Sequence, residues 1–224
     1  MNDFPFAIVG FDLDGTFLDT SADLTAAVNH ALGSAGRSLL SIEQVKPMIG
    51  GGAKHMLEQG MAATGGCQAA ELQVLYRQLL DYYETNISTH SQPFPGALKA
   101  LDELDGMHVK VAIVTNKFES FAVKLLTELG FLDRFMTVIG GDTMGPGRAK
   151  PAADPILEMI DRCGGGRTAF VGDSIYDIMA AKNAGIANVA CSFGFLMQPV
   201  GELNADAVID HYDELIPTLR RIGA

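Results

Sequence analysis

Cysteine is scarce in this sequence, which argues against a disulfide scaffold and against a zinc site. The chain of 224 residues holds three cysteines, at positions 67, 163 and 191, which lie far apart and form no CxxC pair. An odd, widely spaced set favours neither disulfides nor metal-bound thiolates. The five histidines are scattered too, without metal-ligand spacing. We therefore expect reduced thiols and assign no role to any histidine.

Basic residues are also in deficit. The sequence has 16 lysines and arginines against 27 aspartates and glutamates, which gives a net charge of -11 at pH 7. An excess of negative charge repels nucleic-acid phosphates and anionic lipid headgroups. We expect no nucleic-acid partner and no membrane partner, and any phosphate-binding site must gather its cations locally.

Long apolar runs are absent. No run approaches the roughly 18 residues that a membrane span needs, and the first residues, MNDFPF, lack the basic and apolar regions of a signal peptide. With 48% apolar and 19% charged residues, the composition is that of a globular protein. We expect a cytoplasmic protein that is a monomer or a weak homodimer.

Short apolar segments recur along the chain and are typical of buried strands. They are residues 6–11, 109–114, 137–139, 168–171, 188–190 and 207–209. Helical patterns lie between the later segments, and two of them end before Gly130 and Gly185, where a helix C-terminus favours glycine. Strands that alternate with helices predict an α/β fold with a doubly wound, Rossmann-like parallel sheet.

One stretch, residues 21–92, breaks this alternation because it shows helical patterning alone. Four of its apolar residues are spaced for one face of a long helix: Leu72, Leu75, Leu79 and Tyr83. Ser41 and Gln44 form a capping-box pattern that opens another helix, and the glycines at 50–52 must end it, because three glycines cost too much inside a helix.

An all-helical cap domain is therefore predicted to be inserted into the α/β core. We place the cap at residues 19–92 and the α/β core at residues 1–18 and 93–224. The outward linker is expected at residues 18–20, and Pro93-Phe94-Pro95-Gly96 is expected to form a stiff return hinge.

Two carboxylates directly follow the first predicted strand. Asp12 and Asp14 occur in the order Asp-x-Asp-Gly-Thr, and ligands of open parallel sheets bind beyond the carboxyl ends of the strands. At this spacing one carboxylate can attack phosphorus while the other protonates the leaving oxygen, a role that suits Asp14. A turn or helix cap is the alternative for an isolated Asp-Gly pair, but the full pattern with Gly15 and Thr16 favours chemistry.

Two further segments are predicted to end at the same sheet edge. Thr115 and Asn116 follow the strand at 109–114, so their hydroxyl and amide can meet phosphate oxygens, although a turn is the alternative. Lys150 lies in a loop rich in glycine and proline. It can place a cation on the phosphate and on the attacking Asp12, although a lone loop lysine is usually solvated.

A magnesium site is predicted beside these groups. Asp173 follows the strand at 168–171, and Asp177 lies one helical turn further on. Magnesium takes one or two protein carboxylates together with waters and phosphate oxygens. Asp12, the backbone carbonyl of Asp14 and Asp173 would be sufficient for Mg²⁺. The alternative is that Asp173 and Asp177 only cap a helix and stabilise its first turn.

Four segments resemble, in order, the four motifs of the haloacid dehalogenase-like hydrolase superfamily. They are FDLDGTFLDT at 11–20, IVTNK at 113–117, AKP at 149–151 and VGDSIYD at 171–177. The similarity spans almost the whole chain. Within the superfamily the sequence is similar to the phosphoglycolate phosphatase branch, whose members carry a helical cap after the first motif.

The resemblance implies a Mg²⁺-dependent phosphatase that hydrolyses a small phosphomonoester, here 2-phosphoglycolate, through a phosphoaspartate. The implied catalytic residues are Asp12, Asp14 and Lys150. The implied phosphate contacts are Thr115, Asn116 and Lys150, and the implied metal ligands are Asp12, Asp14 and Asp173. The supporting residues around them would be Thr16, Ser174 and Asp177.

The segment Gly50-Gly51-Gly52-Ala53-Lys54 resembles the cap loop that descends over the site in this family. Glycine lets a backbone approach a ligand closely, so Gly51 and Gly52 are candidate substrate contacts, and Lys54 is a candidate partner for a substrate carboxylate. The alternative is a simple interhelical turn with a solvated lysine.

Residues in the motifs of this sequence bear on the other activities known in the superfamily. Asp14 argues against carbon–halogen cleavage, because the dehalogenases lack an aspartate there. Sugar-phosphate mutases share all four motifs and stay open, as do pyrophosphatases and nucleotidases. A non-catalytic binding protein is disfavoured, because no motif is damaged. Ala153 stands where the family usually has a proline, which bears on loop rigidity and not on chemistry.

Overall fold

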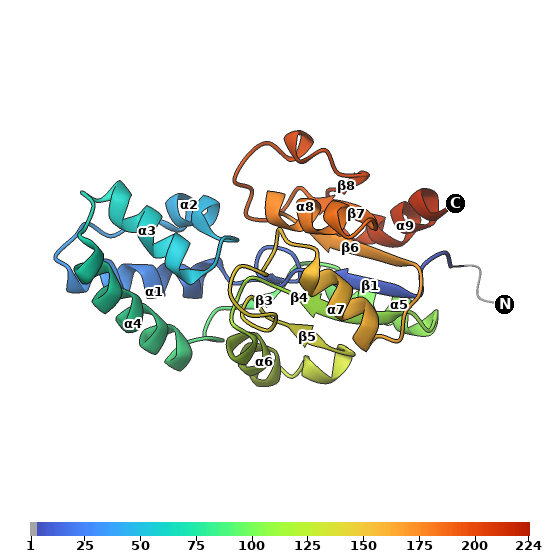
Figure 1. Cartoon of the computed structure of the whole chain (residues 1–224), viewed down its shortest axis with the longest axis horizontal. Coiled ribbons are helices and arrows are strands. Elements are labelled where there is room, and N and C mark those ends of the chain that lie inside the picture. The colour runs from blue at the N-terminus through green and yellow to red at the C-terminus, as the bar shows by residue number, and fades with distance from the viewer. Residues whose placement is uncertain (1–3) are drawn as a thin grey trace.

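A six-stranded parallel sheet forms the centre of the protein, which a computed structural model describes for residues 4–224 (Figure 1). The strands are β1 (Ile8–Phe11), β4 (Lys110–Val114), β5 (Val138–Ile139), β6 (Thr168–Gly172), β7 (Ala187–Cys191) and β8 (Ala207–Ile209). Their order is β5-β4-β1-β6-β7-β8, and every neighbouring pair is parallel. All six predicted strands are confirmed, although the first begins at Ile8 because its pairing with β4 and β6 starts there.

Helices cover both faces of this sheet, as its largely apolar and buried strands require. Val9 and Phe11 of β1 share a cluster with buried residues of the helices on one face, whereas Ile8 shares a cluster with α7 and α8 on the other. The helices around the sheet are α5 (Ala97–Gly106), α6 (Glu119–Glu128), α7 (Asp154–Arg162), α8 (Ile175–Asn183) and α9 (Leu215–Gly223), with short 3-10 turns at Leu132–Arg134, Val200–Leu203 and Tyr212–Glu214. The doubly wound α/β prediction is confirmed.

A separate group of helices lies between β1 and β4 in the sequence and stands beside the sheet in Figure 1. We call residues 21–85 the helical segment. It comprises α1 (Ser21–Ser34), α2 (Ile42–Val45), a 3-10 turn (Lys46–Met48), α3 (Ala53–Ala63) and α4 (Ala69–Thr85). The capping box of Ser41 and Gln44 is present. Helix α4 buries three of the four residues predicted for its apolar face, Leu75, Leu79 and Tyr83, and the fourth, Leu72, is partly buried. No helix within residues 4–224 combines the length and the apolar character that crossing a membrane requires.

The two connections to the helical segment run side by side. Strand β2 (Leu18–Asp19) pairs antiparallel with β3 (Gln92–Pro93). The sequence predicted a linker at residues 18–20 and a stiff hinge at residues 93–96, and it did not reveal this pairing. Two residues per strand are too few to leave a pattern in the sequence. The buried Asp23 of α1 adds a second tie, because its carboxylate accepts hydrogen bonds from the backbone amides of His90 and Ser91 and from the Ser91 hydroxyl, at 2.7 to 3.0 Å.

Candidate active site

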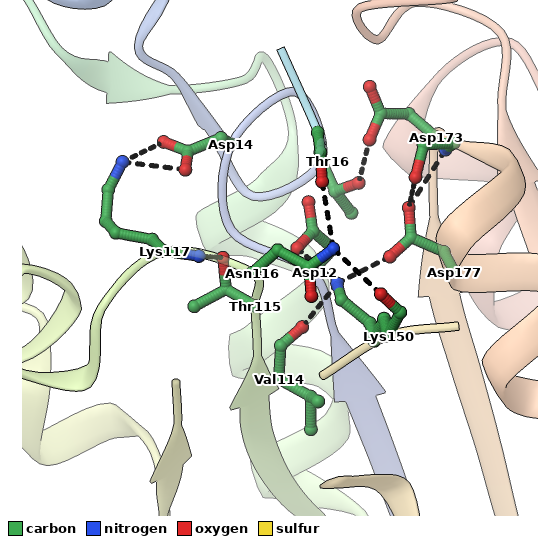
Figure 2. Close-up of polar contacts among 12 residues, drawn as sticks. Asp12, Asp14, Thr16, Val114, Thr115, Asn116, Lys117, Lys150, Asp173 and Asp177 are labelled. Carbon is green, nitrogen blue, oxygen red and sulfur yellow. Dashed lines mark hydrogen bonds and ion pairs between the residues drawn. The ribbon is translucent and has the colours of Figure 1, made fainter. Parts of the chain in front are cut away.

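Polar residues from separate parts of the chain meet at the carboxyl edge of the sheet (Figure 2). Strand β1 lies between β4 and β6. Asp12 comes directly after β1, Thr115 after β4 and Asp173 after β6, so the three residues lie beside one another. Lys150 reaches the same place from the loop after β5. The convergence predicted from the sequence is confirmed.

Lys150 is the cation at the centre of this site. Its side chain is 2% exposed, and its ammonium donates hydrogen bonds to Asp12 Oδ1 at 2.6 Å, to Asp177 Oδ1 at 2.6 Å and to the Val114 carbonyl at 2.8 Å. A buried ammonium needs such partners, because desolvation of an unpaired charge is costly. The predicted contact of Lys150 with Asp12 is therefore present.

Burial dominates the electrostatics of the cluster. It raises the pKa of Asp12 from 3.8 to about 7, even though the Lys150 charge lowers this pKa, and the charges of Asp177 and Asp14 add to the rise. Burial, followed by the charges of Asp177 and Asp12, also raises the pKa of Asp173 well above its usual value. Burial alone would lower the pKa of Lys150, but Asp12 and Asp177 outweigh it and raise that pKa. Three buried carboxyl groups thus share one lysine, and their ionised forms together carry a surplus of negative charge.

Asp12, Asp173 and Asp177 could hold a metal ion together. One carboxylate oxygen of each lies within 4.8 Å of the others, and all three residues are buried. Asp173 is fixed by hydrogen bonds from the Thr16 hydroxyl at 3.0 Å and from the Phe195 amide at 2.6 Å. Oxygen donors of this kind suit hard divalent cations, so the donor set fits a metal that offsets the surplus charge.

Asp177 also serves a structural purpose. Its Oδ2 accepts hydrogen bonds from the backbone amide and the hydroxyl of Ser174, and the first of these bonds belongs to a capping box at the start of α8. The capping alternative is thus correct for Asp177 and wrong for Asp173, because the N-cap of α8 is Ser174. The other oxygen of Asp177 still meets Lys150. One carboxylate both caps a helix and orients the central lysine.

Asp14 points away from the Asp12–Asp173–Asp177 cluster (Figure 2). Its Oδ1 accepts a hydrogen bond from the Thr20 hydroxyl at 2.7 Å, and both of its oxygens lie 2.7 Å from Lys117 Nζ. The Lys117 side chain is 6% exposed and that of Asp14 is 11% exposed. No role could be assigned to Lys117 from the sequence, because a lysine after a strand looks the same in sequence whether it is solvated or buried.

Thr115 and Asn116 lie where they were predicted, but their hydrogen bonds are internal. The buried Thr115 hydroxyl accepts from the Lys117 amide at 3.1 Å. The Asn116 amide nitrogen donates to the Gly50 carbonyl at 3.0 Å and to the Lys150 carbonyl at 3.2 Å. Asn116 therefore ties the helical segment to the site, and its contact with phosphate remains a prediction.

A cavity of about 160 Å³ opens between the site and the helical segment. Asp12, Asp14, Thr115, Asn116 and Lys117 line one side. The glycines at 50–52 and Lys54 line the other, so the predicted cap loop does approach the site.

The loop over the cavity is held by close packing. A Cβ at Gly51 would lie 2.5 Å from the ring of His55, so this position has no room for a side chain. The ring of His55 fills the space beside Gly51, a packing role that the sequence did not reveal. Lys54 is less well placed than expected, since its side chain is 65% exposed and lies 3.9 Å from Glu58.

Comparison with known proteins identifies the family. The sequence profile described as haloacid dehalogenase-like hydrolase matches residues 9–191. The chain belongs to the haloacid dehalogenase-like hydrolases. A phosphoglycolate phosphatase of Agrobacterium fabrum (strain C58 / ATCC 33970) is 37% identical over 218 residues, which cover 96% of this chain and 92% of that protein. One of Caulobacter vibrioides (strain ATCC 19089 / CIP 103742 / CB 15) is 35% identical over 215 residues, covering 95% of this chain and 90% of its own.

A solved structure supports the same assignment. The crystal structure of a predicted phosphoglycolate phosphatase from Haemophilus somnus 129pt superposes with a TM-score of 0.88 at 27% sequence identity, covering 96% of this chain and 98% of its own. The family resemblance drawn from the four motifs is confirmed, and so is the haloacid dehalogenase-like fold.

Proposed function

We propose that this haloacid dehalogenase-like hydrolase is a Mg²⁺-dependent phosphatase that hydrolyses 2-phosphoglycolate through a phosphoaspartate on Asp12. The observation that carries the proposal is the position of Asp12, which is buried after the central strand, lies 2.6 Å from Lys150 Nζ and lines the cavity. The substrate comes from the relatives, since the proteins 35–37% identical over most of this chain are phosphoglycolate phosphatases.

In the first step an Asp12 carboxylate oxygen attacks phosphorus. A new bond forms between this oxygen and phosphorus, and the bond between phosphorus and the glycolate oxygen breaks. Asp14 gives a proton to the departing alkoxide, which leaves as glycolate. Because an alkoxide is a poor leaving group, this proton is worth a factor of about 10² to 10⁴ in rate. Lys150 favours the ionised form of Asp12 and orients it, and Thr115 and Asn116 contact phosphate oxygens.

In the second step water replaces the enzyme at phosphorus. Asp14 removes a proton from the water as it attacks, and the bond between phosphorus and Asp12 breaks, releasing inorganic phosphate and the free carboxylate. Asp14 thereby recovers the proton that it lost in the first step. Coverage by the helical segment would exclude other water from the first step.

The residues that would hold Mg²⁺ are Asp12, Asp173 and the backbone carbonyl of Asp14, with Asp177 nearby. The fit rests on the buried oxygen donors within 4.8 Å of one another and on the raised pKa values of Asp12 and Asp173. When bound there, Mg²⁺ supplies positive charge that offsets the charge of the phosphate and of the carboxylates.

The helical segment completes the proposal as a cap. We take residues 19–92 as the cap domain and residues 1–18 and 93–224 as the hydrolase core, a division supported by the paired strands β2 and β3 at the junction. Gly51 and Gly52 would bring backbone close to the substrate, and Lys54 would add positive charge at the mouth of the cavity. The small-molecule substrate, a cytoplasmic location and a monomeric or weakly dimeric state belong to the same proposal.

The test is phosphate release from a panel of phosphorylated metabolites that includes 2-phosphoglycolate, glucose 1-phosphate, a nucleoside monophosphate and pyrophosphate. The wild type should prefer 2-phosphoglycolate and require Mg²⁺, and the isosteric Asp12→Asn variant should be inactive while staying folded. Conversion of glucose 1-phosphate to its isomer without phosphate release would identify a mutase. Full activity of Asp12→Asn would refute the mechanism.

A further inference from the structure

A second buried ion pair lies beside the leaving-group side of the site, and the proposed chemistry leaves its lysine without a task. Lys117 Nζ lies 2.7 Å from both oxygens of Asp14, and both residues line the cavity. Lys117 also meets the helical segment, because its ammonium lies 4.9 Å from the ring centroid of Tyr83 on α4. It is the cation that stands between the proposed acid and the cap.

The position of Lys117 relates directly to the shape of the substrate. In 2-phosphoglycolate a single methylene separates the ester oxygen from the carboxylate. Asp14 must lie next to the ester oxygen if it protonates the leaving group, so a cation that touches Asp14 is within reach of the carboxylate. An ammonium has three donor hydrogens, which allows Lys117 to bond a substrate carboxylate and Asp14 together.

The surroundings make Lys117 a stronger anion partner than Lys54. Lys117 is 6% exposed, whereas Lys54 is 65% exposed and has Glu58 at 3.9 Å. Charge pairs gain more in a buried site of low effective dielectric than in water. The wall above Lys117 is neutral, because burial raises the pKa of Tyr83 to about 12 and its hydroxyl stays protonated.

We propose that Lys117 is the residue that recognises the carboxylate of the substrate and so selects phosphomonoesters that carry a carboxylate next to the ester. This inference rests on the proposed phosphatase function. Lys54, at the exposed edge of the cavity, contributes little to the choice. Lys117 exchanges part of its bonding with Asp14 for the substrate carboxylate, while Tyr83 keeps the ammonium in place.

The test compares 2-phosphoglycolate with ethyl phosphate, which has a methyl group in place of the carboxylate. The measured quantity is the ratio of the two kcat/KM values. Any effect of a Lys117 variant that acts only through Asp14 lowers both kcat/KM values together, and it cancels in the ratio. Loss of a hydrogen-bonded charge pair should lower the ratio about 100-fold in Lys117→Met. Lys54 is the rival candidate for this contact, and Lys54→Met should change the ratio less than about threefold.

Two more variants guard against a folding defect. Lys117→Gln keeps a donor for Asp14 without the charge and should lower the ratio as Lys117→Met does, whereas Lys117→Arg keeps the charge and should restore most of it. In the inactive Asp12→Asn background, calorimetry should show that Lys117→Gln weakens binding of 2-phosphoglycolate and spares ethyl phosphate.

The outcomes distinguish an error about Lys117 from an error about the proposed phosphatase function. An unchanged ratio in folded Lys117→Met or Lys117→Gln, with the wild type still active on 2-phosphoglycolate, would overturn the role of Lys117 alone. An equal fall of the ratio in Lys54→Met would overturn it as well. Failure of the wild type to hydrolyse 2-phosphoglycolate would instead reject the proposed function.

Discussion

Replacing Lys150 by methionine should destabilise the protein strongly and in a way that depends on pH. The ammonium bridges Asp12 and Asp177 at 2.6 Å each and is 2% exposed. Removing one partner of a buried ion pair costs about 3–5 kcal/mol, because it leaves an uncompensated charge. The second carboxylate and the unpaired Val114 carbonyl place Lys150→Met toward the upper end of this range.

The sign of the pH dependence follows from Asp12. Its folded pKa of about 7 already lies above its usual value of 3.8, and loss of Lys150 raises it further. Between these pKa values the folded state binds more protons than the unfolded chain, so the free energy of unfolding falls as pH rises. The deficit of Lys150→Met should therefore be larger at pH 8 than at pH 5.5.

Urea unfolding of the wild type and Lys150→Met, both without Mg²⁺, measures this effect at the two pH values. Lys99→Met is the matched control, because Lys99 forms an ion pair with Asp213 at 2.9 Å but its side chain is 65% exposed. It should change the free energy of unfolding little at either pH. A Lys150→Met deficit no larger than that of the control, or one independent of pH, would refute the reasoning.

Three further predictions concern the metal cluster and the junction. Because burial raises the pKa values of Asp12 and Asp173, Mg²⁺ must displace protons, so its affinity and the thermal stabilisation it gives should increase from pH 5.5 to pH 8; calorimetry that finds equal affinity at both would count against this. Gly194→Ala should cost about 1–3 kcal/mol and weaken Mg²⁺ binding, since its Cβ would lie 2.2 Å from Asp173 Cβ, whereas at Gly201 it would meet nothing within 4 Å. Gly201→Ala is therefore the control, and equal urea midpoints for Gly194→Ala and Gly201→Ala would contradict that packing. Asp23→Asn should cost about 1.5–3 kcal/mol, because Asp23 accepts hydrogen bonds from His90 and Ser91 at the junction, and a cost no larger than that of the exposed Asp81→Asn would show that this tie is weak.

The sequence predicted the convergence of the site because strand ends are visible in sequence. Asp12, Thr115 and Asp173 each follow an apolar run, and parallel strands bring their carboxyl ends to one edge. Lys150 was predicted at Asp12 because the reaction needs a cation there, and the structure has this contact. The first prediction depends on where strands end, which short sequence patterns reveal. The second depends on the charge that the proposed reaction requires.

Side-chain burial and partner choice could not be predicted in the same way. Lys117 pairs with Asp14 across 103 positions of sequence, and nothing in the segment Thr115-Asn116-Lys117 tells that its lysine is buried. Asn116 was expected to meet phosphate, yet its amide nitrogen contacts the Gly50 and Lys150 carbonyls. Such contacts depend on how the helical segment lies against the sheet, which short-range patterns do not encode.

The measurement that tests the central claim most directly is a search for the phosphoryl group on the enzyme during turnover. The Asp14→Asn variant, in which hydrolysis of the intermediate should be slow, is mixed with Mg²⁺ and acetyl phosphate, whose acetate leaving group needs no acid. The reaction is quenched in acid, and the peptides of the enzyme are analysed by mass spectrometry. The account predicts one added phosphoryl group on the peptide that contains Asp12, and on Asp12 itself. Turnover with no phosphoryl group on Asp12, or with the group on another residue, would contradict it.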